Sequence, residues 1–203
     1  MRPVVLVGET RSARNLATLA ALDWGRMFVT ERPTPFAGEK WGFDNGAFGA
    51  YCRGLAFPRA AFLRRLEAAE LVAAGPYLAV APDRVAGGLR SLEFSEWWMS
   101  RGRLPDDWPW YLAVQDGMSP ADVEPCARRY SGLFLGGTDQ FKRTAPAWAR
   151  LARRCGIRFH YGRASTPSML GLVGEVGADS CDSAFPLWTD ARMAAFVAAW
   201  RAL

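Results

Sequence analysis

Trp110-Tyr111-Leu112-Ala113-Val114-Gln115-Asp116 is an apolar run that ends on two polar residues. A helix start follows at Ser119-Pro120-Ala121-Asp122, where Asp122 lies near the positive end of the helix dipole. A second apolar run, Gly132-Leu133-Phe134-Leu135-Gly136-Gly137, comes next. Near-continuous apolar runs are typical of parallel strands that are buried on both faces. The stretch therefore predicts a strand–helix–strand unit.

The same alternation extends along the chain in both directions. Eight segments are expected to be strands: residues 3–8, 26–30, 41–44, 77–83, 110–116, 132–137, 158–162 and 178–182. Helical patterns are expected at 13–22, 59–74, after Ser91, after Ser119, and at 147–155, 168–176 and 190–203. Only the second and third strands are joined by a Pro-rich loop, residues 32–40, instead of a helix.

Eight strands with about seven helices predict a compact (β/α)8 barrel of the TIM type, in one domain over residues 1–203. A doubly wound open sheet is the alternative. No Gly-x-Gly-x-x-Gly or Gly-x-x-x-x-Gly-Lys motif follows the first strand, which argues against a nucleotide-cofactor Rossmann domain.

The composition is that of a globular protein, with 50% hydrophobic and 22% charged residues. No signal peptide or membrane span is recognisable, so a cytoplasmic protein without a membrane partner is expected. The four cysteines form no Cys-x-x-Cys pair and there is one histidine, so neither a metal nor another cofactor is expected. The net charge of +5 is compatible with a nucleic-acid partner, and equally with an Arg-rich composition alone.

A barrel places its active site at the carboxyl ends of the strands. Polar or glycine residues end most of the expected strands, and all of them should face one mouth: Glu9, Asp44, Asp83, Gln115, Asp116, Gly136, Gly137, Thr138, Asp139, Arg163 and Asp182. Asp44 could be a carboxylate at the pocket floor beside the aromatic face of Phe48, or an Asx turn that only binds the backbone. Asp83 could equally be a loop or cap residue.

Two carboxylates, Asp179 and Asp182, lie three residues apart in a small, apolar segment. Ionising them there is costly unless a site uses the charge. With a strand period of two they point to opposite faces, so only one should enter the pocket. This segment and the acidic strand end at Asp44 suggest a nucleophile and a proton-transfer partner, and the residues alone leave Asp179 and Asp182 as rivals for the first segment's role.

Basic residues near these strand ends could contact a nucleic-acid backbone. Lys142, Arg143 and Arg163 are the candidates, although Lys142 and Arg143 could equally lie in a solvated loop. His160 is expected to be a core or supporting histidine. Trp97 belongs to a tryptophan group that is expected to pack on the barrel, with stacking on an extruded base as the alternative.

The order of the motifs carries a family resemblance. Asp-x-Gly-[Gly/Ala]-Phe, a strand-end Asp, Val-Gln-x-Gly, Gly-Gly and Gly-x-Asp-x-x-Asp follow one another over residues 43–183. This order resembles the tRNA-guanine transglycosylases. It looks closer still to the 7-deazapurine DNA transglycosylases of phages and bacterial genomic islands. In that family an Asp attacks C1′ of a nucleoside and displaces guanine, and an incoming 7-deazapurine then displaces the enzyme.

The resemblance implies a role for each matching residue. Asp182 would be the nucleophile and Asp44 the general acid/base. The base-binding set would be Asp83, Gln115, Gly136, Gly137, Asn45 and Phe48. Asp179 would support Asp182, with the opposite assignment of the two acids as the alternative. Paired carboxylates also suit the oxocarbenium-like transition state at a ribosyl C1′.

The chain departs from the family pattern in four places, one of which is Val114-Gln115-Asp116-Gly117 in place of Val-Gln-Gly-Gly. The Cys-x-Cys-x-x-Cys zinc subdomain of the tRNA enzymes is not seen before Leu203. Asp44-Asn45-Gly46-Ala47 replaces Asp-Ser-Gly-Gly, and residues 138–143 replace Leu-Ala-Val-Gly-Glu, where the incoming base is sensed. The expected function is therefore exchange of guanine in DNA for a preQ0-like 7-deazapurine. A tRNA or free-nucleoside transglycosylase or glycosidase, and a non-catalytic base-binding barrel, are the alternatives.

Overall fold

Eight parallel strands close into a barrel in the computed structural model, which describes residues 2–29 and 32–203. The strands are β1 (Val4–Val7), β2 (Gly25–Phe28), β3 (Gly42–Phe43), β4 (Leu78–Val80), β5 (Trp110–Val114), β6 (Gly132–Leu135), β7 (Arg158–Tyr161) and β8 (Ser180–Ser183). Each strand pairs with its neighbour in sequence, and β8 closes on β1 with Val4 beside Ser180. The predicted (β/α)8 barrel is confirmed. Thr30, the last residue of the expected strand 26–30, lies outside the described residues.

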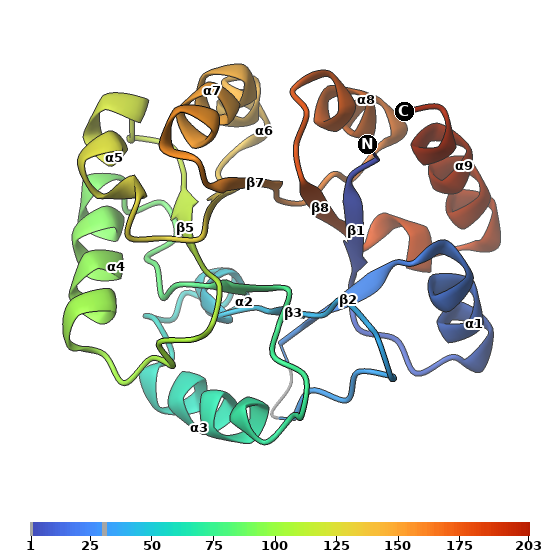
Figure 1. Cartoon of the computed structure of the whole chain (residues 1–203), viewed down its shortest axis with the longest axis horizontal. Helices are drawn as coiled ribbons and strands as arrows, with labels where there is room; N and C mark the ends of the chain where they lie inside the picture. The colour runs from blue at the N-terminus through green and yellow to red at the C-terminus, as the bar shows by residue number, and fades with distance from the viewer. Residues whose placement is uncertain (1, 30–31) are drawn as a thin grey trace.

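Helices form a ring around the strands (Figure 1). They are α1 (Ala13–Leu22), α2 (Ala47–Tyr51), α3 (Arg59–Glu70), α4 (Leu89–Arg101), α5 (Pro120–Ala127), α6 (Asp139–Lys142), α7 (Ala145–Cys155), α8 (Pro167–Glu175), the 3-10 turn η1 (Phe185–Leu187) and α9 (Asp190–Arg201). Within the described part of the connection between β2 and β3 there is no helix, as expected. The two chain ends lie close together beside α8 and α9 (Figure 1).

Local signals in the sequence fix most helix ends. Ser119 and Asp122 form a reciprocal capping box at the start of α5. Gly156 ends α7 with a φ of 69°, a left-handed conformation that glycine adopts without strain. The expectation for Ser91 was wrong. This residue lies inside α4, which begins after Gly88, and its hydroxyl accepts a hydrogen bond from the Arg84 backbone N–H.

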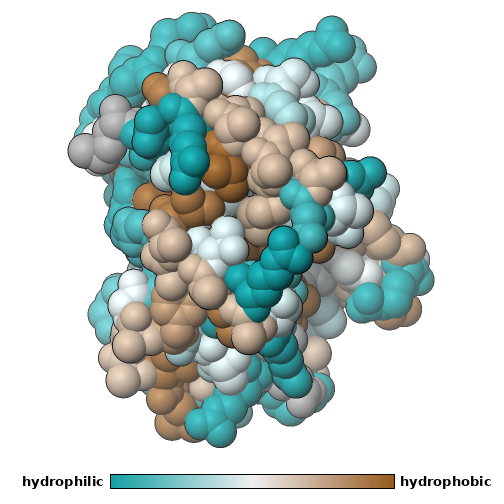
Figure 2. Space-filling view, turned by 90° about the vertical axis from the view of Figure 1, so that its right-hand side faces the viewer, coloured by the Kyte–Doolittle hydropathy of each residue, from teal (hydrophilic) through white to brown (hydrophobic). Residues whose placement is uncertain are grey.

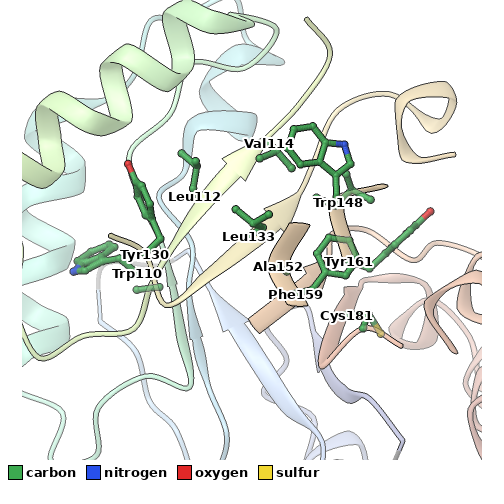
Figure 3. Packing of buried hydrophobic residues seen from close by; sticks show 14 of the residues in the cluster. Trp110, Leu112, Val114, Tyr130, Leu133, Trp148, Ala152, Phe159, Tyr161 and Cys181 are labelled. Atoms are coloured by element: carbon green, nitrogen blue, oxygen red, sulfur yellow. The ribbon is translucent and has the colours of Figure 1, made fainter. Parts of the chain in front are cut away.

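Alternate strand residues face two different apolar layers. Val5 and Val7 point outward into the large cluster between barrel and helices, while Leu6 points into the barrel with Met27, Val80 and Tyr111. Figure 3 shows part of this outer layer, with residues from β5 to β8, from α7 and from the loop before β6: Trp110, Leu112, Val114, Tyr130, Leu133, Trp148, Ala152, Phe159, Tyr161 and Cys181. The side that carries α1, α8 and α9 mixes hydrophilic and weakly hydrophobic residues (Figure 2).

This alternation decides which polar side chains enter the barrel. Cys181 belongs to the outer layer, so its neighbours Ser180 and Asp182 face inward. Ser180 is paired in register with His160 of β7, and Asp182 with Leu6 of β1. The interior is therefore apolar near its middle and polar where β7 and β8 meet.

Candidate active site

A cavity of about 440 Å³ opens at the carboxyl ends of the strands. Its walls come from segments at or just after β3 to β8: Asp44, Asn45, Phe48, Tyr51, Val80, Asp83, Val85, Ala86, Ala113, Val114, Gln115, Asp116, Phe134, Gly136, Gly137, Thr138, Asp139, Arg163 and Asp182. Every polar or glycine strand-end residue predicted from the sequence is among them except Glu9, whose Oε1 accepts a hydrogen bond from Val29 N–H. Val80 and Ala113 form an apolar floor.

Asp182 is fixed by one of its two carboxylate oxygens. Oδ1 accepts hydrogen bonds from the backbone N–H of Arg163 and from Nε2 of His160, both at 3.0 Å. Oδ2 accepts no hydrogen bond from the residues that the structure describes. The side chain is 18% exposed and lines the cavity. One oxygen is thus anchored and the other is available to a ligand.

His160 links Asp182 to the interior of the barrel. A carboxylate oxygen only accepts, so Nε2 carries a hydrogen, and Nδ1 lies 2.8 Å from the hydroxyl oxygen of Ser180. The ring is fully buried and stacks on Phe134, with centroids 4.6 Å apart. His160 is therefore a supporting residue, as expected, and it sets the orientation of the Asp182 carboxylate.

Asp44 combines the two interpretations that the sequence left open. Its Oδ1 accepts a hydrogen bond of 2.6 Å from Gly46 N–H, which is the Asx turn, and the same side chain lines the cavity. Burial raises the pKa of the Asp44 carboxyl, and the charge of Asp182 raises this pKa further against the opposing effects of Gly46 N–H and Arg65. Asp44 is thus disposed to hold a proton more readily than an ordinary carboxyl group.

Asp83 lies in a buried amide network at one wall. Its Oδ1 accepts from Asn45 Nδ2 at 2.8 Å and its Oδ2 from Gln115 Nε2 at 3.3 Å. Burial raises the pKa of Asp83 to about 6. Asn45 also donates to Ala81 O and accepts from Ala47 N–H, so its amide mainly positions Asp83.

Gln115 keeps one group for a ligand. Its Nε2 donates to Asp83, Ser91 Oγ and the Arg84 carbonyl, while Oε1 accepts nothing from the described residues. The side chain is buried in the cavity wall. Gln115 therefore offers an acceptor beside the Asp83 carboxyl.

The paired glycines present backbone groups to the cavity, but not equally. Gly136 N–H donates to Val114 O within the sheet edge, so only its carbonyl is open. Gly137, at a φ of 75°, has an N–H with no acceptor among the described residues. A Cβ at Gly137 would lie 2.6 Å from Asp116 Oδ2, so this backbone geometry requires glycine.

Arg163 crosses the mouth of the cavity. Its Nη2 donates to Gly137 O at 2.6 Å, and its guanidinium carbon lies 4.6 Å from the centroid of the Phe48 ring on α2. Its backbone N–H holds Asp182 at the same time. Arg163 thus joins the loops after β6 and β7 to α2 and brings a positive charge to an acidic cavity.

Three predicted site residues lie outside the cavity. Lys142 is 1% exposed, its ammonium donates to Arg163 O, and it lies over the Tyr161 ring, so the expectation of a rim lysine was wrong. Asp179 precedes β8 at its amino end, where its carboxylate accepts from Phe159 N–H. It cannot support Asp182 across the length of the strand, and this expectation is corrected too. Arg143 is exposed beyond α6 and is not among the cavity residues.

Several contributing residues were missed in the sequence. Tyr51, Val85 and Ala86 line the cavity from loops and a short helix that no periodic pattern announces. The pairing of His160 with Ser180 and Asp182 had a usable signal. Two residues spaced by two on one strand share a face, and a histidine on the adjacent strand can face them.

The described residues include no group of three or more His, Cys, Asp and Glu side chains arranged to hold a metal ion. None of their helices is both long enough and apolar enough to cross a membrane. The cavity holds two carboxyl groups in different environments, Asp44 and Asp182, beside hydrogen-bonding groups, an arrangement that can serve acid–base or nucleophilic chemistry. A cavity at this end of the barrel is compatible with an enzyme.

Comparisons with known proteins add no assignment. No family model matches the chain, and no curated protein matches it. A solved structure that matches is a glycerophosphodiester phosphodiesterase from Parabacteroides distasonis, with 11% identity, 100% coverage of both chains and a TM-score of 0.43. A structural similarity with this identity and TM-score says nothing about the chemistry of the cavity.

Proposed function

We propose that the chain is a base-exchange transglycosylase that replaces guanine in DNA with a preQ0-like 7-deazapurine through a covalent intermediate on Asp182. The observation that carries the proposal is the asymmetric hold on this carboxylate, with Oδ1 anchored by His160 and Arg163 and Oδ2 open to the cavity. A nucleophile needs one fixed position and one free lone pair, and Asp182 has both.

The two half-reactions balance with the residues of the cavity. Asp182 Oδ2 attacks C1′ of the target nucleotide, the C1′–N9 bond breaks with its electron pair going to the base, and the proton of Asp44 neutralises the departing guanine. An incoming 7-deazapurine then gives its N9 proton to Asp44 as N9 attacks C1′. The ester bond breaks and Asp182 is released as the carboxylate. The raised pKa of Asp44 favours this proton-carrying role.

The base would be recognised by the part of the cavity wall that contains Asp83, Gln115 and Gly137. The Asp83 carboxyl and Gln115 Oε1 are acceptors suited to the ring N–H and amino group of guanine. The N–H of Gly137 is a donor suited to the guanine carbonyl. Guanine and a 7-deazaguanine share this edge, so one set of contacts serves both the departing and the incoming base. The volume of about 440 Å³ is in the usual range for a small-molecule site.

DNA is proposed as the polymer because the order of the motifs is similar to that of the DNA-acting enzymes and the chain carries a net charge of +5. The target nucleotide has to be single-stranded or flipped, since a stacked base hides C1′ and the recognition edge. A tRNA substrate is the principal alternative.

Mass spectrometry of digested nucleosides tests the proposal. Single-stranded DNA, duplex DNA and tRNA are each incubated with enzyme and preQ0, and the deazapurine nucleoside is quantified. We expect incorporation into DNA, and a loss of at least about 1,000-fold in Asp182→Asn, because the nucleophile is gone. Incorporation into tRNA alone would favour the alternative polymer. The absence of both deazapurine incorporation and guanine release would refute the proposal.

A further inference from the structure

A second cavity adjoins the first, with a volume of about 560 Å³. It lies between α2 with its following loop, the loop after β4, and α4, and is lined by Ala47, Tyr51, Leu55, Ala56, Phe57, Arg59, Asp83, Arg84, Val85, Phe94, Trp97 and Trp98. Tyr51, Asp83 and Val85 line both cavities, so the two share a wall. The reaction described above does not use this second space.

Aromatic faces and positive charge dominate the second cavity. Tyr51 and Trp97 are 51% and 37% exposed, in contrast to the buried Trp98 beside them. Two guanidinium groups stand over the aromatic wall: Arg59 lies 5.3 Å from the Trp97 ring centroid, and Arg84 lies 4.7 Å from that of Phe94.

Negative charge in the second cavity is limited to one buried acid. Asp83 is 7% exposed and is the only acid among the residues that line the second cavity. Its carboxyl oxygens accept hydrogen bonds from the side-chain amides of Asn45 and Gln115. Neither Arg59 nor Arg84 forms an ion pair with a carboxylate of the described residues. The space is therefore suited to a flat, apolar group joined to an anion.

We propose that the second cavity binds the nucleotide that neighbours the target in the same DNA strand, with its base stacked on Trp97 and its phosphate paired with Arg59 and Arg84. This inference rests on the proposed function. A target nucleotide bound at Asp182 stays linked to the next nucleotide of its DNA strand by a phosphodiester. Because Tyr51 lines both cavities, the second cavity lies beside the first, where that next nucleotide would be. Stacking on an aromatic ring tolerates any base, because every base has a π-face.

Binding of short single-stranded DNA with one central guanine tests the inference. The full chain carries Asp182→Asn so that no covalent step interferes, and the neighbour on each side of the guanine is replaced in turn by an abasic site. In this protein one of the two replacements should weaken binding roughly fivefold or more. With Trp97→Ala added, that penalty should fall below about twofold, while Trp97→Phe should retain it.

A matched control is available elsewhere on the surface. Trp188 is exposed and has Arg192 stacked 4.6 Å from its ring, yet it lines neither cavity. Trp188→Ala should keep the full abasic penalty. An equal penalty with and without Trp97, or no penalty on either side, would overturn the inference.

The two proposals fail in different ways. Exchange of the base in DNA without any abasic penalty would contradict the second cavity as a nucleotide site and leave the transglycosylase reaction standing. An abasic penalty that depends on Trp97, in a chain that exchanges no base, would support the nucleotide site and contradict the reaction.

Discussion

At the scale of single residues, the chemistry depends on how differently three neighbouring carboxyl groups are held. Asp182 has one oxygen anchored by His160 and Arg163, whereas Asp44 is bound by a single backbone N–H and Asp83 by two side-chain amides. Carboxyl groups in different surroundings can take opposite proton roles in one site. This is why the nucleophile and the acid are assigned to Asp182 and Asp44 and not the reverse.

Asp83 predicts a specific pH dependence of stability. Its pKa is raised from an ordinary 3.8 to about 6, so its protonated form stabilises the folded state below pH 4, and this contribution is lost as the pH rises through 6. The loss amounts to about 3 kcal/mol at about 1.4 kcal/mol per pH unit. Asp83→Asn should lack it.

Urea unfolding at intervals between pH 4 and pH 7.5 measures this effect as the difference between the two proteins. As the pH rises, the free energy of unfolding of Asp83→Asn should increase relative to that of the parent chain. If the two free energies instead change in parallel with pH, the pKa of Asp83 is not raised in the folded protein.

Residues at strand ends could be predicted from the sequence because the apolar runs mark where each strand stops. Asp44, Asp83, Gln115 and Asp182 were found this way, and all line the cavity. Asp179 was misjudged because two acids close in sequence were expected to act together, whereas the direction of β8 places Asp179 at the amino end and Asp182 toward the carboxyl end.

At the scale of elements, the loop between β3 and α2 is held from outside the cavity. Arg65 of α3 donates to Asn45 O and Val29 O and is buried, so it ties the loop that carries Asp44 to the rest of the barrel. Gly46, at a φ of 76°, lies against this guanidinium. The position of Asp44, the proposed general acid, therefore depends on a glycine and an arginine that are not among the cavity residues.

Gly46→Ala should destabilise the protein more than an equivalent change without the arginine contact. A Cβ at Gly46 would lie 2.6 Å from Arg65 Nη2, whereas one at Gly38, with a φ of 81°, would meet nothing within 4 Å. Both variants incur about 1–2 kcal/mol for left-handed backbone. Gly46→Ala should lose about 2 kcal/mol more, because the bonds of a charged donor are disturbed.

Chemical unfolding of both variants against the parent chain gives the comparison, with Gly38→Ala as the control for backbone strain alone. Equal losses in the two variants would mean that the Arg65 contact contributes nothing to the hold on this loop.

Short elements were the part of the fold that sequence patterns predicted poorly. Helix α6 spans only Asp139–Lys142, and its single turn directs Lys142 into the protein, where burial lowers the pKa of the ammonium to about 8. A segment of that length has no hydrophobic period to read. The same holds for α2, which carries Tyr51 into the walls of both cavities.

At the scale of the whole molecule, the barrel brings together residues that are up to 138 positions apart, from Asp44 to Asp182. The eight strands and their order were predictable because each apolar run is followed by a start signal or a loop. The side-by-side position of the two cavities was not, since it depends on where α2 and α4 lie relative to the loop after β4. The net positive charge of the chain suits a polyanionic strand, and the acidic groups of the cavity suit the positive charge that develops on the reacting sugar.

The most direct test of the central claim is intact-mass measurement of a covalent complex between the protein and single-stranded DNA, with no incoming base. The account predicts a species with the mass of chain plus DNA minus one guanine. It should be present in Asp179→Ala and absent in Asp182→Ala. An adduct that survives Asp182→Ala, or one that disappears in Asp179→Ala, would contradict the assignment of Asp182 as the nucleophile.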